Sequence, residues 1–155
     1  MKNLRTQVLC VCISLISLTS AAQKQSIPVT EPDYNKPKLF QNMPAVIPVS
    51  TEELNSLLNS NTGRNISFAT NTSFRFDGQI VSTASKYENT IQSVVVKSSN
   101  FEGARFTLSR ITNTDGTISY TGRIISFQHG DAYILKTEGT QMSLVKKDFY
   151  DLVNE

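Results

Sequence analysis

The sequence predicts a mainly β protein: an antiparallel meander that forms a small barrel or a two-layer sandwich, with one short amino-terminal helix. Two observations support this fold class. From residue 64 onward, apolar and polar residues alternate along the chain, which is the pattern of strands that are buried on one face. Short turn-forming segments separate these runs without a helical pattern between them, as is typical of antiparallel strands joined by hairpins.

The strand pattern extends over six runs, at residues 74–80, 91–97, 104–109, 118–124, 132–136 and 142–146. Six or seven such strands are enough for a small barrel or sandwich, and the helix would cap one open end. Gly78 and Gly122 occupy the same place in two similar segments. Because glycine weakens a strand, we expect both to mark bends or close approaches of another backbone.

One helix is predicted at about residues 50–59. Ser50 and Glu53 have the spacing of a capping box, in which each side chain accepts a hydrogen bond from the other residue's backbone. An apolar stripe at helical spacing follows, and Asn59 ends it. The stripe consists of Leu54, Leu57 and Leu58. We expect this stripe to pack on the core of the domain.

Three parts are predicted along the chain. Residues 1–22 have the form of a signal peptide, and small residues at their end place cleavage after Ala22. Residues 23–49 contain all five prolines and form either a linker or an extended arm that is docked on the domain. Residues 50–155 form a single β-rich domain that begins with the helix.

The signal peptide predicts that the mature protein is secreted or periplasmic. Its apolar core, residues 8–18, is well short of the roughly 20 residues that cross a bilayer, so no stable membrane span is expected after cleavage. Both cysteines lie within the signal, which leaves the mature chain without a disulfide or a thiol nucleophile. Without Lys2 and Arg5, 13 of the 15 basic residues remain, against 13 acidic ones. This balance gives no electrostatic case for nucleic acid or for an anionic membrane.

Catalytic residue types are scarce. The chain has one histidine, His129, and Asp131 lies two positions after it. Such a pair could serve as general base and orienting carboxylate, while the simpler interpretation is an exposed turn at His129. The chain has no HExxH motif and no paired-cysteine spacing, and we expect neither a metal nor a cofactor. The sequence therefore favours a protein that is not an enzyme.

Three arginines fall on the polar faces of predicted strands: Arg75, Arg105 and Arg123. If these strands are neighbours, the arginines could form a patch for an anionic partner. The alternative is pairing across strands with acidic residues, of which Asp77, Glu102 and Asp115 are the nearest in the pattern. Since the mature chain has no net charge, the sequence favours this second interpretation.

The segments at residues 106–110, 122–124 and 130–133 carry a resemblance to a known class of protein. Their pattern resembles the non-catalytic, β-rich amino-terminal region that precedes the zinc catalytic domain in some secreted bacterial metallopeptidases. It is also similar to stand-alone exported proteins of Bacteroidetes-type bacteria. The resemblance implies a pro-domain-like role in folding assistance or inhibition, with no functional residue carried over.

The leading hypothesis is an exported, non-catalytic β-domain that acts as a protein-binding or accessory module. Its expected partner is another exported protein, and the resemblance makes a peptidase one candidate. Two alternatives stay open: a small secreted hydrolase that uses His129 and Asp131, and a structural component of the cell envelope. No nucleic acid is expected as a partner.

Overall fold

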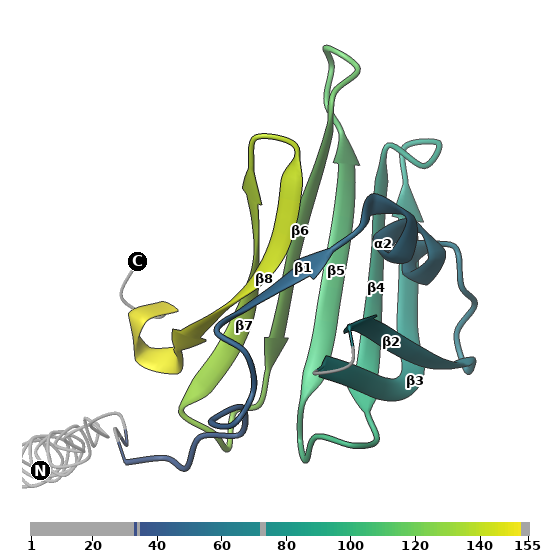
Figure 1. The fold of residues 1–155 in the computed structure, drawn as a ribbon. Helices are drawn as coiled ribbons and strands as arrows, with labels where there is room; N and C mark the ends of the chain where they lie inside the picture. Colours follow the sequence, from purple (N-terminus) through teal and green to yellow (C-terminus); the bar gives the residue numbers. More distant parts are fainter. Residues whose placement is uncertain (1–32, 34, 72–73, 153–155) are drawn as a thin grey trace, which may run out of the picture. The chain divides into compact units, whose positions relative to one another are not determined.

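The computed structural model describes residues 33, 35–71 and 74–152, which form a curled antiparallel sheet with one α-helix (Figure 1). The predicted signal peptide, its cleavage site after Ala22 and residues 23–32 lie outside the described residues. The strands of the described part are β1 (Val46–Val49), β2 (Asn65–Asn71), β3 (Phe74–Lys86), β4 (Ile91–Ser98), β5 (Arg105–Thr112), β6 (Ile118–Ile125), β7 (Asp131–Glu138) and β8 (Gln141–Asp148).

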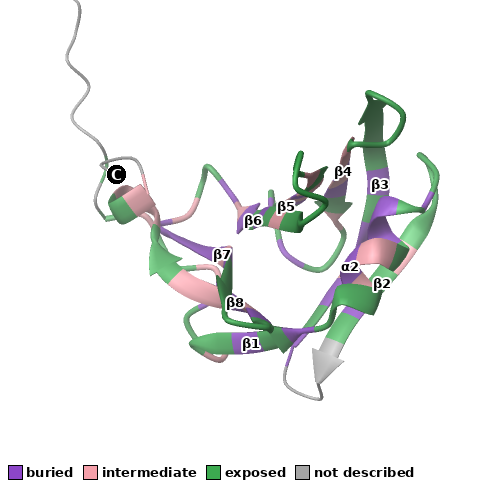
Figure 2. Ribbon diagram, turned by 90° about the horizontal axis from the view of Figure 1, so that it is seen from above, coloured by how far each residue is buried: buried purple, intermediate pink, exposed green. Residues whose placement is uncertain are grey.

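The strand order is β1-β8-β7-β6-β5-β4-β3-β2, and every neighbouring pair is antiparallel. Strands β2 to β8 therefore form a meander of consecutive hairpins, and β1 closes onto β8. Viewed from above, the sheet curls into an open half-barrel with β1 and β2 at its two ends (Figure 2). The predicted mainly β, antiparallel fold is confirmed, as a single curled sheet instead of two stacked layers.

Strand β1 lies within the segment that the sequence left as a linker or docked arm, so the sheet begins before residue 50. The Lys146 amide donates to the Ala45 carbonyl (2.8 Å), which places the backbone groups of alternate residues, Ile47 and Val49, toward β8. Pro48 therefore points its nitrogen away from β8, at the edge of the sheet. A proline is tolerated there because no ladder hydrogen bond is lost.

The helix α2 (Thr51–Leu58) is capped as the sequence predicts. The Ser50 side chain accepts from the Glu53 amide, and the Glu53 carboxylate accepts from the Ser50 amide. The stripe Leu54, Leu57 and Leu58 is buried in the core, and α2 packs against β4 and β5. The helix therefore fills the concave side of the half-barrel.

Aromatic rings make up much of the core on the same concave side. Phe74 and Phe76 on β3, Phe106 on β5 and Tyr133 on β7 are all buried. Phe74 and Tyr133 pack edge to face with ring centroids 5.5 Å apart, and Phe76 and Phe106 do so at 6.0 Å. The first contact joins β3 to β7 across the concave side, and the second joins β3 to β5 across the intervening β4.

Candidate functional site

Asp131, one of the two residues that the sequence proposes for catalysis, is buried at the start of β7 with 1% of its surface exposed. Its Oδ1 atom accepts a hydrogen bond from the Leu39 amide (2.7 Å), and its Oδ2 atom accepts one from the Phe40 amide (2.9 Å). Phe40 is itself fully buried. The carboxylate therefore fastens the segment before β1 to the sheet through two charge-assisted hydrogen bonds.

His129, the other catalytic candidate, is half-buried in the turn before β7. Its Nδ1 atom lies 2.8 Å from the Ser126 hydroxyl, and its amide donates to the Ser126 carbonyl (3.1 Å). Within the described residues, no hydrogen bond or ion pair joins His129 to Asp131. The sequence pattern does not single out Ser126 as a partner of His129, although it lies three residues before the histidine in one turn.

The three arginines named from the sequence occupy two separate places. The Arg75 Nε atom lies 2.8 Å from Asp77 Oδ1 on the same strand, and this bond, more than that from Ser67, holds the pKa of the Asp77 carboxyl below its usual range. Arg105 and Arg123 lie on the outer face of the neighbouring strands β5 and β6. The structure brings these two together and keeps Arg75 apart from them.

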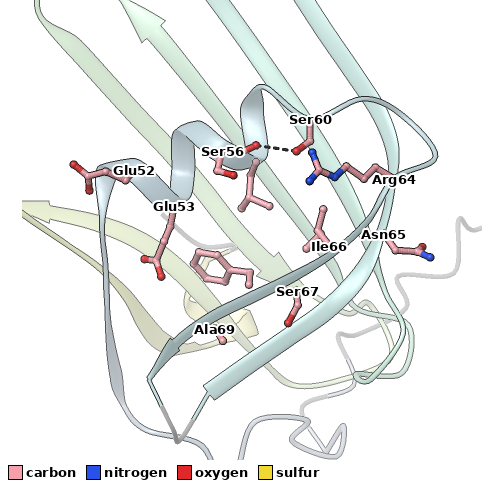
Figure 3. A pocket seen from close by; sticks show the side chains of 11 residues that line it. Glu52, Glu53, Ser56, Ser60, Arg64, Asn65, Ile66, Ser67 and Ala69 are labelled. Carbon is pink, nitrogen blue, oxygen red and sulfur yellow. Dashed lines mark hydrogen bonds between the residues drawn. The ribbon is translucent and has the colours of Figure 1, made fainter.

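A pocket of about 490 Å³ opens between α2 and β2 (Figure 3). The carboxylates of Glu52 and Glu53 lie toward one end of the pocket, and the guanidinium of Arg64 lies toward the other (Figure 3). Leu57 and Phe68, both buried, add apolar surface. The remaining lining residues are Ser56, Ser60, Asn65, Ile66, Ser67 and Ala69. All of β2 up to Ala69 therefore borders this pocket.

Strand β2 also presents an open edge to the pocket. The Ile80 amide donates to the Arg64 carbonyl (2.9 Å), so the backbone groups of Arg64 and of alternate residues after it point toward β3. The backbone groups of Asn65, Ser67 and Ala69 therefore point away from β3. Among the described strands β2 is the last in the sheet order, and none of them pairs with these N–H and C=O groups.

The two ends of the sheet differ in how well their edges are protected. On β1 the open edge carries Pro48, which has no N–H and so hinders the addition of another strand. On β2 the sequence Asn65–Asn71 has neither a proline nor a charged residue. Unprotected edges are templates for pairing with another chain. Sequence reasoning missed this site because it depends on strand order, which the alternation of residues does not reveal.

The described part of the chain contains no group of three or more histidine, cysteine, aspartate or glutamate side chains that could hold a metal ion. None of its helices is long and apolar enough to cross a membrane. The chain has no match among protein-family models, curated proteins or solved structures.

Proposed function

We propose that the chain is an exported, non-catalytic module that binds another protein by adding an extended segment of that partner to strand β2. The observation that carries this proposal is the open, uncharged and proline-free edge of β2 beside the pocket under α2. Strand addition is a recurrent mode of peptide recognition in which main-chain hydrogen bonds provide the affinity. Here the backbone groups of Asn65, Ser67 and Ala69 would provide them.

The pocket would add selectivity to this backbone pairing. Side chains of an added strand alternate between the two faces of the sheet, so every second one would lie on the α2 side. There, apolar side chains meet Leu57 and Phe68. Within the described residues, the side chains of Glu52 and Arg64 form no ion pair or hydrogen bond, and they lie toward opposite ends of the pocket. We therefore expect a segment with an apolar centre, a basic residue near Glu52 and an acidic residue near Arg64.

The partner in this proposal is another exported protein, because the signal peptide predicts a secreted or periplasmic location. A peptidase is the first partner to test, given the resemblance of the chain to pro-domain-like regions. Asp131 has a structural role in this account, since both of its carboxylate oxygens hold the segment before β1.

Ser67→Pro tests the proposal, because it removes an N–H from the open edge without removing a hydrogen bond from the β2–β3 ladder. The matched control is Val46→Pro, which removes an N–H from the open edge of β1. The mature chain and both variants would serve as bait for the exported fraction after their folding is verified by circular dichroism. We expect one specific partner to be recovered by the parent and by Val46→Pro, and to be lost with Ser67→Pro. Recovery that is unaffected by Ser67→Pro would contradict strand addition at β2.

A further inference from the structure

We infer that the outer face of strands β4 to β8 is a second interaction surface, and that it binds an acidic segment of a protein. This cationic face is defined by five exposed side chains, one on each strand: Lys97, Arg105, Arg123, Lys136 and Lys147. It lies on the convex side of the half-barrel, opposite the core and α2 (Figure 2).

The strand register brings these cations together. Lys97 on β4 is directly opposite Arg105 on β5, and Lys147 on β8 lies in the same row across the sheet. Arg123 on β6 lies in the next row, opposite Thr107, which is two residues from Arg105. Like charges directly opposite one another on a sheet repel and destabilise the pair. An anionic occupant would relieve this repulsion.

The described residues provide little compensating charge on this face. The ion pairs found among them are Lys38–Asp148 and Arg75–Asp77, and none of the five cations forms an ion pair or a side-chain hydrogen bond. Among the outward-facing positions of β4 to β8, the one acidic residue is Glu138, at the end of β7.

The charge balance of the mature chain does not reveal that basic side chains are concentrated on one face. Five of the acidic side chains lie instead on α2 or in the turns between strands: Glu52, Glu53, Glu88, Glu102 and Asp115. The predicted mature chain, with 13 basic and 13 acidic residues, can therefore present a face of one sign, which composition alone does not predict.

The shape and composition of the face favour a protein segment as the occupant. Its cations are distributed over five strands of a convex surface, so a flat membrane would reach only part of the set at once (Figure 2). Half-buried apolar side chains lie between the cations, namely Ile125, Ile134 and Val145. A flexible segment with acidic and apolar residues can follow the curvature and match both kinds of side chain.

Fluorescence anisotropy of a labelled peptide tests this inference on the mature chain. The probe consists of glutamate and valine residues, and its counterpart has glutamine in place of glutamate. We compare the parent with Arg105→Glu/Arg123→Glu, and we use Arg75→Glu/Lys86→Glu, two exposed residues of β3, as a control that changes the net charge equally away from the face. We expect the parent to prefer the glutamate peptide by about tenfold or more at low salt, and to lose that preference at about 0.5 M salt.

The preference should disappear in Arg105→Glu/Arg123→Glu and persist in the control and in Ser67→Pro. If Ser67→Pro retains the preference for the glutamate peptide, the cationic face binds independently of the proposed β2 site. Either proposal can therefore fail alone. Equal affinity for the two peptides, an unchanged preference in Arg105→Glu/Arg123→Glu, or an equal loss in the control would overturn the inference. Binding to phosphatidylglycerol vesicles without binding to the peptide would overturn it too, by assigning the face to a membrane.

Discussion

At the scale of single residues, Gly78 and Gly122 have different surroundings, although they occupy the same place in two similar sequence segments. A Cβ atom on Gly78 would lie 2.4 Å from the Lys97 carbonyl oxygen and 2.9 Å from Val96 Cγ1. The oxygen belongs to the backbone of β4 and cannot move away without disturbing the β3–β4 ladder. A Cβ atom on Gly122 would meet only side-chain atoms, at 3.3 Å or more. The close backbone approach that we expected at both glycines is therefore found at Gly78.

Gly78→Val should accordingly reduce the free energy of unfolding by about 3 kcal/mol or more, and Gly122→Val by about 1–3 kcal/mol. The control is Gly139→Val, since Gly139 has a φ of +60° and no atom within 4 Å of an added Cβ. The loss in free energy of unfolding of Gly139→Val should come from the strained backbone alone, at about 1–2 kcal/mol. Urea midpoints measure all three. A Gly78→Val variant as stable as the parent would show that β3 and β4 do not approach this closely.

Tyr133 provides a pH-dependent test of the core. Its ring is fully buried and its hydroxyl donates to the Pro44 carbonyl. Burial, with a smaller effect of the Asp131 charge, raises the pKa of the Tyr133 hydroxyl from 10.0 to about 12. The folded state thus favours the neutral form. The stability it contributes is complete below pH 10.0 and is lost as pH rises toward about 12.

Tyr133→Phe should therefore lose less stability than the parent between pH 10.0 and about 12, even if it is less stable at neutral pH. Urea unfolding at successive pH values measures this difference. Phenolate absorbance of the folded parent should show a tyrosine that ionises near pH 12 and that is missing in Tyr133→Phe. Equal slopes of stability against pH in the two proteins would contradict a buried, neutral Tyr133.

At the scale of elements, two charged side chains anchor the segment before β1. Asp131 accepts from the Leu39 and Phe40 amides, and the Lys146 ammonium donates to the carbonyls of Phe40 (3.0 Å) and Met43 (2.7 Å). The Phe40 ring then packs 4.9 Å from the ring of Tyr133, measured between centroids. Buried hydrogen bonds and ring packing together position this segment against β7 and β8.

Asp131→Asn should destabilise the protein by about 1–3 kcal/mol. The Asn side chain has one oxygen in place of two, so either the Leu39 or the Phe40 amide loses its acceptor and faces the side-chain NH₂ group. The control is Asp148→Asn, which removes an exposed ion pair with Lys38 and should cost less than about 1 kcal/mol. Limited proteolysis around Phe40, combined with urea unfolding, distinguishes a loosened segment from general destabilisation. Equal behaviour of the two variants would show that Asp131 does not anchor the segment.

The sequence predicts those elements whose cause is local. The capping box and leucine stripe of α2 lie within nine residues, Ser50–Leu58, and β3 to β8 carry their own alternation. Strand β1 is not predicted because its partner β8 lies far along the chain and because the prolines in and around it indicate irregular structure. Strand β2 is not predicted because, among its residues 65–69, only Ile66 and Phe68 face the interior. Likewise, the roles of Asp131 and of the cationic face depend on register, which no local pattern contains.

At the scale of the whole molecule, the sheet curls without pairing its two ends. A closed barrel has no edges, whereas this half-barrel has one at β1 and another at β2. Pro48 protects the first, and α2 leaves a pocket beside the second. In the proposed account, the β2 edge of the described sheet serves for strand addition, and the cationic outer face lies on other strands.

The most direct test of strand addition at β2 is amide hydrogen exchange on the mature chain, alone and with the recovered partner. In the chain alone, the Ser67 and Ala69 amides should exchange rapidly, while the Phe68 amide, which points toward β3, should be protected. With the partner bound, the account predicts that Ser67 and Ala69 become protected and that Val46, on the other edge, does not. Protection that appears elsewhere, with Ser67 and Ala69 still exchanging rapidly in the complex, would contradict it.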